Sequence, residues 1–524
     1  IGYNALTALT EGDNNVAIGS GALDAITTGN DNVAIGKDAL GSVAVGEGSN
    51  VAVGMYAMRN MDEGTAGGDI NANIAIGYDA FKGGDLAGND RQITYNIAIG
   101  QYALDATNDN AHTGTIAIGG YALSALTSGI YNTVIGYQAG LGSTANSNNT
   151  IVGYQAFKTA DGNESGNVVL GTNCGDLINN DLCDNNVFIG FETGRGGTGA
   201  LKNAIAIGRD ALKSTAGNDN EGAVAIGYEA LTALTTGARN TAIGYKSGAE
   251  EAAGNDNTLL GYEALHDGGG LANLSNTMIG SQTGDGAWQN NASSYNTAVG
   301  HGCMRGVMDG ALHNVAMGFV ALGALTTGSR NTVIGGGSGS AITTGSNNTL
   351  IGNNAKVSAV DVNDEIVLKC GADNLAGGGT ETIRIGVDSD YITNDFGENA
   401  TWTHSSDRRI KKDIKDSELG LDFINDLRPV TFKKKAPSEY PQEFEQYNAN
   451  TTERKNPDRK HYGFIAQEVK EAMDKAGHSE FPVWKENKDG MQELGETELI
   501  TPLIKAVQEL SAEVKSLKQQ LEDK

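Results

Sequence analysis

Few residues in this chain combine a type and a spacing that could support chemistry. Ser406 opens a charged run, SDRRIKKDI (residues 406–414), and Lys411 follows it after five positions. A hydroxyl and an amine at this spacing do not by themselves predict a nucleophile and a base, because a Ser before a charged run is most often a helix cap. Trp288 and Tyr295 lie in a long stretch between repeats and carry rings that can stack on sugars, so they are candidate receptor contacts.

The other residues show no pattern typical of a metal site or of a glycosidase active site. The Asp and Glu side chains of residues 1–405 occupy variable positions, without the recurrent carboxylate pair that glycoside hydrolysis needs. The four cysteines (Cys174, Cys183, Cys303, Cys370) match no metal-ligand spacing, and we expect buried thiols, with a Cys174–Cys183 disulfide as the alternative. The sequence predicts no metal site and no cofactor.

Two chemically different segments meet near residue 405. Of the 37 basic and 64 acidic residues, 21 and 24 lie after that position, which leaves 16 basic and 40 acidic residues before it. All six prolines follow residue 405, whereas 69 of the 74 glycines precede it. A Gly-rich segment without proline suits a backbone that turns often and still donates its N–H groups to a regular ladder. Such an acidic segment is a poor ligand for nucleic acid, and no apolar run approaches the roughly 20 residues of a membrane span.

A repeat of about 17 residues fills the first segment. The unit is clearest at residues 240–248 (NTAIGYKSG) and reads Asn-x-Ala-Ile-Gly-Tyr-x-Ala-Leu, followed two or three residues later by Thr-Thr-Gly. Its β-branched run predicts a strand, its glycines permit tight corners, and the recurring Asn is expected to stack into a ladder of side-chain amides. Spacing is mostly 17 to 20 residues and stretches to 23, with copies at Asn15, Asn32, Asn50, Asn73, Asn96, Thr115, Asn132, Asn149, Asn167, Asn186, Ala204, Ala223, Asn240, Asn257, Asn276, Asn296, Asn314, Asn331 and Asn348, and a degenerate copy at Ser42.

Each unit is too small to bury its own apolar side chains, so neighbouring units must stack into one continuous core. The sequence therefore predicts a mostly β fold: an elongated β-solenoid or multi-chain β-helix over residues 1–356, then a β-rich transition over 357–405. Long stretches between repeats, at 58–72, 82–95 and 283–295, are expected to lie on the surface, where they either vary freely or bind a partner.

The last segment has mixed character and ends in a helix. The strand-like LRPVTFKKK (427–435) and the helix-like GFIAQEV (463–469) precede apolar residues at alternating steps of three and four. That spacing predicts a coiled-coil helix over residues 500–524, and its Val and Leu core positions by themselves favour two strands. The core positions are Ile500, Leu503, Val507, Leu510, Val514, Leu517 and Leu521.

Two resemblances to known families rest on these motifs. The NxAIG units of residues 1–355 resemble the shafts of phage tail fibres and the heads of trimeric autotransporter adhesins, in both of which three chains wind together. SSDRRIKKDI (405–414), LRPVTFKKK, YGFIAQEVKEAM (462–473) and the terminal helix resemble, in this order, the intramolecular chaperone autoprotease domain of endosialidase tailspikes and several long tail fibres. This resemblance implies a small α+β chaperone domain at residues 406–499 and a homotrimer.

The second resemblance also implies a self-cleavage. The family cuts before the Ser of its Ser-Asp motif, using that Ser and the Lys five positions on, which match Ser406 and Lys411. Cleavage would fall between Ser405 and Ser406: Ser406 Oγ attacks the preceding carbonyl carbon, and water resolves the ester. The Lys must lose its proton, which burial or neighbouring cations favour, and a turn must join the pair, since five residues do not share a helical face. His404 is a second candidate base.

The sequence thus predicts a phage tail-fibre or tailspike-type protein, assembled in the host cytoplasm and carried on the virion. Its C-terminal domain would align three chains and then leave by one self-cleavage. Expected partners are two further copies and a host-cell receptor, a glycan or an outer-membrane component, but neither nucleic acid nor a membrane. Two alternatives stay open: a bacterial trimeric surface adhesin, and a tailspike that degrades polysaccharide. Because Ile1 falls within a repeat, we also expect residues before it.

Overall fold

Two compact units, Ile1–Ser405 and Ser406–Lys524, make up the computed structural model of the chain. Residues 399–404 are described by their backbone alone. No helix among the described residues has the length and apolarity that a membrane crossing requires. The structure describes residues 1–42, 46–61, 69–84, 92–107, 110–215, 220–371, 375–387, 390–396, 399–404, 406–444, 446–453 and 460–523.

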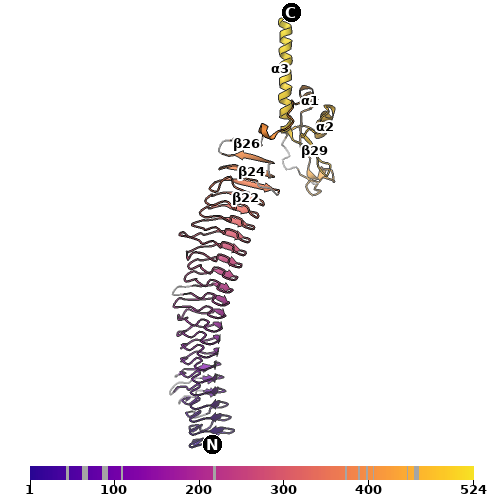
Figure 1. Ribbon diagram of the computed structural model, residues 1–524. Coiled ribbons are helices and arrows are strands. Elements are labelled where there is room, and N and C mark those ends of the chain that lie inside the picture. The colour runs from indigo at the N-terminus through magenta and orange to yellow at the C-terminus, as the bar shows by residue number, and fades with distance from the viewer. Residues whose placement is uncertain are drawn as a thin grey trace. The chain divides into compact units, whose positions relative to one another are not determined.

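The first unit is a β-solenoid in which each repeat forms one coil and the coils stack along one axis (Figure 1). Neighbouring coils pair in parallel, with Val16 opposite Val33 at one end and Thr332 opposite Thr349 towards the other. The predicted β-solenoid is therefore confirmed. Its three-residue strands are β1 (Val16–Ile18), β2 (Val33–Ile35), β3 (Val51–Val53), β5 (Ile74–Ile76), β7 (Ile97–Ile99), β9 (Ile116–Ile118), β10 (Thr133–Ile135), β11 (Thr150–Val152), β12 (Val168–Leu170), β13 (Val187–Ile189), β14 (Ile205–Ile207), β15 (Val224–Ile226), β16 (Thr241–Ile243), β17 (Thr258–Leu260), β18 (Thr277–Ile279), β19 (Thr297–Val299), β20 (Val315–Met317), β21 (Thr332–Ile334) and β22 (Thr349–Ile351).

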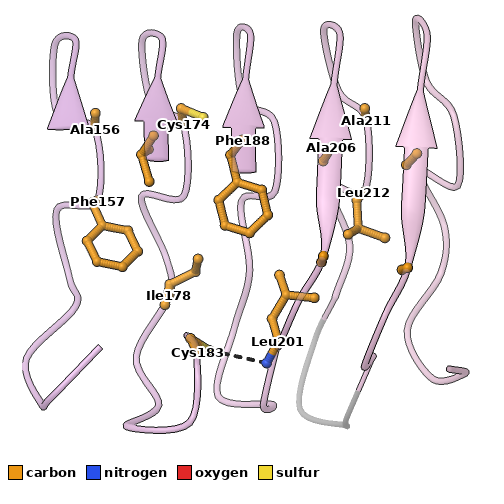
Figure 2. Packing of buried hydrophobic residues seen from close by; sticks show 14 of the residues in the cluster. Ala156, Phe157, Cys174, Ile178, Cys183, Phe188, Leu201, Ala206, Ala211 and Leu212 are labelled. Atoms are coloured by element: carbon orange, nitrogen blue, oxygen red, sulfur yellow. Dashed lines mark hydrogen bonds between the residues drawn. The ribbon is translucent and has the colours of Figure 1, made fainter. Parts of the chain in front are cut away.

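Each of these strands turns its central residue into the core and its two flanking residues outward, as the period of two requires. The central residue is most often Ala, and it is buried in every one of them. Larger side chains from the rest of each coil, such as Phe157 and Leu212, fill the remaining space, and Figure 2 shows them in this interior together with Phe188, the central residue of β13. One apolar cluster extends from Ala17 to Leu375, so the core is continuous along the stack, as predicted.

The Gly that follows each strand forms a corner that a larger residue would disrupt. Gly244 has φ of +140°, and a Cβ on it would lie 2.2 Å from the carbonyl oxygen of Gly261 in the next coil. The same close approach recurs along the stack, for example between Gly136 and Gly153. Glycine is therefore needed both for the backbone conformation and for the spacing of the coils.

A ladder of Asn side chains joins successive coils and is confirmed. Asn296 Oδ1 accepts the backbone N–H of Asn314 at 3.0 Å, and Asn314 Nδ2 donates to the carbonyl of Gly328 at 2.9 Å. Each such Asn thus ties the start of its coil to the preceding coil and to its own last corner. The ladder runs over Asn15–Asn96, Asn132–Asn186 and Asn240–Asn348, with Thr115, Ala204 and Ala223 at the breaks.

The longer coils contain a second small sheet. The strands β4 (Asp69–Asn71), β6 (Gln92–Thr94) and β8 (His112–Thr113) pair in parallel and bury Ile70, Ile93 and His112. The ends of the predicted surface stretches at 58–72 and 82–95 therefore pack in the core, whereas residues 62–68 and 85–91 lie outside the described residues. The apolar run of the degenerate copy predicted at Ser42, residues 43–45, lies outside the described residues, and β2 pairs directly with β3.

The parallel stack continues beyond the last recognisable repeat. β23 (Ile366–Cys370) and β24 (Thr382–Val387) lie within the β-rich transition expected over residues 357–405, and they add two further parallel pairings. Glu365 takes the place of the ladder Asn: its backbone N–H donates to Asn348 Oδ1, and its carboxylate accepts the N–H of Gly379. The antiparallel strands β25 (Asp390–Asp395) and β26 (Asn399–His404) end the unit.

None of the four cysteines forms a disulfide. Cys174, Cys183 and Cys303 are buried, as expected, and burial raises the pKa of the Cys174 thiol to about 12. The expectation of a buried thiol is wrong for Cys370, which ends β23 and is exposed.

The second unit is a small α+β domain. Its core contains Phe423, Val469, Met473 and Val483, and the helix α2 (Ala466–Lys475) supplies two of these, so the helix expected in the GFIAQEV segment is confirmed. Its strands form two antiparallel pairs, β27 (Val430–Phe432) with β28 (His461–Gly463) and β29 (Trp484–Glu486) with β30 (Gln492–Leu494). Its helices are η1 (Arg408–Ile410), α1 (Leu421–Asp426), η2 (Pro437–Glu439), α2 (Ala466–Lys475), η3 (Glu496–Leu499) and α3 (Ile500–Glu522).

The Asn ladder predicts a specific loss of stability. Asn314→Ala leaves the buried N–H of Asn331 and the carbonyl of Gly328 without their side-chain partners. We expect the free energy of unfolding to fall by about 1–3 kcal/mol. Asn353→Ala, at an exposed position off the ladder, should change it by less than about 0.5 kcal/mol. Denaturant unfolding followed by circular dichroism measures both, and equal midpoints for the two variants would contradict the role of the ladder.

Candidate functional site

Ser406 and Lys411 are in hydrogen-bond contact. Lys411 Nζ donates to Ser406 Oγ at 2.7 Å. The single 3₁₀ turn η1 lies between them, and the backbone N–H of Lys411 closes it on the carbonyl of Arg408 at 3.2 Å. The chain therefore contains the turn that the spacing of five requires. Both side chains are exposed in the single chain.

Asp407 caps this turn. Its Oδ1 accepts the backbone N–H of Arg409 at 2.8 Å, and its carboxylate also accepts hydrogen bonds from the Arg409 guanidinium. The guanidinium first, and then the backbone N–H, lower the pKa of Asp407. Sequence reasoning named Arg409 only as a nearby cation and gave Asp407 no role, although Asp directly before a charged turn is a recognisable N-cap signal.

The bond that would be cut is only partly described. Ser406 is described, whereas Ser405 lies outside the described residues, as does the side chain of His404. The backbone of β26 ends at His404, directly before this site. The geometry at the Ser405 carbonyl therefore stays a prediction.

The segment around the pair is solvent-exposed and carries apolar residues. Ile410 and Ile414 are 66% and 59% exposed, and the first buried side chain after Ser406 is that of Leu419. Arg408, Arg409 and Lys412 supply the cations that the sequence placed near the pair. Burial of the pair, the other expected influence on the lysine, is absent from the single chain within the described residues.

Helix α3 presents an unpaired apolar stripe. The seven predicted core positions from Ile500 to Leu521 are all exposed, between 43% and 74%. At the base of the helix the stripe continues into an apolar groove of about 370 Å³. Its apolar lining is formed by Ile424, Leu427, Pro429, Phe464, Leu499, Ile500 and Leu503. A helix with such a face is suited to self-association, and the coiled coil stays a prediction.

Comparison with known families gave a match in the C-terminal part of the chain. Residues 406–478 match the family model described as chaperone of endosialidase. The match begins at Ser406, where the second unit begins. No curated protein and no solved structure gave a significant match to the chain. The chaperone match supports self-association of the chain and an intramolecular chaperone as its C-terminal part.

The two predicted receptor contacts differ in their surroundings. Trp288 is 2% exposed and lies in the core beside Gly284 and Met278, so the interpretation of its ring as a sugar-stacking surface is wrong. The indole fills space that the small residues of this coil leave open. Tyr295 is 49% exposed, and its ring stacks on that of His313 with centroids 4.9 Å apart. A receptor contact at Tyr295 stays a prediction.

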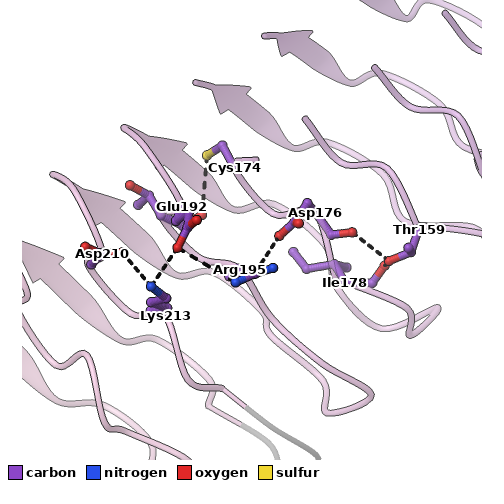
Figure 3. Close-up of polar contacts among 9 residues, drawn as sticks. Thr159, Cys174, Asp176, Ile178, Glu192, Arg195, Asp210 and Lys213 are labelled. Carbon is purple, nitrogen blue, oxygen red and sulfur yellow. Dashed lines mark hydrogen bonds and ion pairs between the residues drawn. The ribbon is translucent and has the colours of Figure 1, made fainter. Parts of the chain in front are cut away.

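A chain of ion pairs crosses three coils on the solenoid surface (Figure 3). Arg195 Nε lies 3.0 Å from Asp176 Oδ1, and Lys213 Nζ lies 2.6 Å from Glu192 and 2.9 Å from Asp210. Hydrogen bonds to Glu192 and then Asp210 raise the pKa of Lys213. Every acid in this network has a cationic partner. The network therefore links neighbouring coils and offers no pair of free carboxylates for catalysis.

Proposed function

We propose that this chain is a phage tail-fibre or tailspike-type protein whose C-terminal chaperone domain assembles a homotrimer and then releases itself between Ser405 and Ser406. Residues 1–405 are the lasting product, which serves on the virion as a structural and host-attachment element. The hydrogen bond between Lys411 and Ser406, at the first residue of the chaperone match, is the observation that carries this proposal.

The outward face of the solenoid strands supports side-by-side association of copies. We call the flanking residues of the nineteen three-residue strands, β1 to β22 without β4, β6 and β8, the strand face. Every one of them is Val, Ile, Leu, Met or Thr, and none is buried. Ile334 and Ile351, for example, are 39% and 41% exposed. A continuous apolar stripe of this length marks an interaction surface.

Charge favours this face over the others as the contact between copies. Residues 1–405 carry 40 acidic and 16 basic residues, so two copies repel each other on average. The strand face contains no charged side chain. Copies that meet there bury apolar surface without bringing carboxylates together. Three copies, as the resemblance of the sequence implies, would enclose the face on every chain.

A uniform strand face also explains the need for a chaperone domain. Each coil offers nearly the same residues, so two chains displaced by one coil would still match well. An alignment device at one end of the chain fixes the register before the long contact forms. The stripe on α3 suits this task, because parallel helices that pair at their apolar positions set the relative height of their chains.

The proposed cleavage uses Ser406 as nucleophile and neutral Lys411 as base. Lys411 Nζ takes the proton of Ser406 Oγ while the oxygen attacks the Ser405 carbonyl carbon. The carbon–nitrogen bond to Ser406 then breaks, the amine of Ser406 receives the proton, and the Ser405 acyl group is held as an ester. Water hydrolyses that ester to the carboxylate of Ser405 and restores the Ser406 hydroxyl. Loss of the chaperone domain would make unfolding difficult to reverse.

Mass spectrometry of three variants tests the cleavage. We expect the wild-type chain to yield two fragments, the smaller beginning at Ser406, and the Ser406→Ala and Lys411→Ala chains to remain whole. Lys415→Ala removes an exposed lysine outside η1 and its flanking cations, and this chain should be cut like the wild type. An intact wild-type chain in an assembled protein, or a cut Ser406→Ala chain, would refute the proposed dyad.

Native mass measurement tests the strand face. Ile334→Asp places a carboxylate on the face in every copy, where the contact would desolvate it, so we expect loss of the trimer or a markedly lower dissociation temperature. Thr327→Asp introduces the same charge at an exposed corner residue of the neighbouring coil. The control should assemble normally. Equal assembly of both variants would place the contact elsewhere.

A further inference from the structure

We propose that Arg409 is a positioning residue for the self-cleavage: it occupies the carboxylate of Asp407 and thereby leaves Lys411 available to Ser406. This inference rests on the proposed cleavage and adds a residue that controls it. Neither Asp407 nor Arg409 would react with the scissile bond.

The contacts of the Asp407 carboxylate are all with one residue. Oδ1 accepts the Arg409 backbone N–H at 2.8 Å and Nε at 3.1 Å, while Oδ2 accepts Nε at 3.1 Å and Nη2 at 2.6 Å. Two carboxylate oxygens offer about four acceptor positions. Arg409 therefore takes up the accepting capacity of Asp407 in the same turn that brings Lys411 to Ser406.

Without this arrangement the carboxylate would compete for Lys411. Asp407 lies four positions before Lys411, a spacing at which an acid and a lysine attract each other across a helical turn. An ammonium paired with a carboxylate keeps its proton, because a nearby opposite charge favours the charged form. Such a lysine cannot accept the proton of the Ser406 hydroxyl. A guanidinium is the stronger competitor, since its planar fork binds both carboxylate oxygens and it stays charged.

The charged groups around the pair come from the same segment. Arg408 and Lys412 are cations next to η1, and Asp413 is the nearest other acid in the sequence. Among the described residues, neither a hydrogen bond nor an ion pair links residues 406–416 to another element. Arg409 thus occupies the carboxylate of Asp407, while the cations Arg408 and Lys412 remain next to Lys411 in the sequence.

Asp407 has a second role that the experiment must separate from the first. Its side chain caps η1, so Asp407→Ala would remove both the cap and the competing charge. Asn is as good an N-cap as Asp and carries no charge. Asp407→Asn therefore keeps the turn while it removes the competitor for Lys411.

The test is the pH dependence of self-cleavage in the full-length chain. The protein is made by cell-free synthesis and moved into buffers of different pH. The rate at which the 406–524 fragment appears is then measured in each buffer. We expect Arg409→Ala to shift the rate profile to higher pH by about one unit, so that cleavage near neutral pH slows about tenfold. The double variant Arg409→Ala/Asp407→Asn should return the profile to that of the wild type. Arg408→Ala removes a cation that does not contact Asp407, and it should shift the rate profile less than Arg409→Ala does.

Each other outcome overturns the inference. A wild-type profile for Arg409→Ala would show that Asp407 does not compete for the lysine. A uniform fall in rate at every pH, without recovery in the double variant, would reduce Arg409 to a structural part of the turn. These results are distinguishable from failure of the proposed function, in which Ser406→Ala would still be cut or the wild type would never be cut.

Discussion

The structure depends on one constraint: a three-residue strand can bury its central side chain and must turn the two beside it outward. A coil of this size has no interior of its own, and its core exists because the next coil covers it. The Asn ladder and the close Gly corners hold the coils at this distance. The same alternation that closes the core leaves an apolar strand face along the whole stack.

That strand face connects the fold to the proposed assembly. A solitary solenoid would expose an uncharged stripe of mostly β-branched residues, which is a risk for nonspecific association. Association with identical chains covers it, but uniform coils specify their mutual register poorly. A separate domain that aligns the chains and is then removed resolves this problem. The assembly would then persist, because chains that unfold after cleavage lack the domain that aligned them and cannot readily refold into a trimer.

Much of the fold could be predicted, because residues that recur at the same position of every repeat have the same structural role in each coil. The Asn, Gly and central Ala positions recur, so the ladder, the corners and the buried strand centre were readable. The β-rich character of residues 357–405 was recognised, but not that β23 and β24 continue the stack, since Glu365 replaces the ladder Asn there. Trp288 was misread because a single aromatic residue between repeats carries no period that distinguishes core from surface.

The site was less accessible to prediction. Ser406 and Lys411 were found through their resemblance to a family motif, and the structure joins them by a hydrogen bond of 2.7 Å. The contact between Asp407 and Arg409 was not predicted, because residues two positions apart do not face each other on a helix and the charged run gave no sign of a strand. Their contact depends on the short turn η1, whose presence the charged run alone does not reveal.

The most direct test of the account compares two routes to the same polypeptide. Residues 1–405 are produced once by cleavage of the full chain and once as a separately expressed segment, and the native mass of each is measured. The account predicts a trimer by the first route and monomers or irregular aggregates by the second, because the separate segment lacks its alignment domain. The same trimer from both routes would show that the shaft registers itself, and would contradict the chaperone role of residues 406–524.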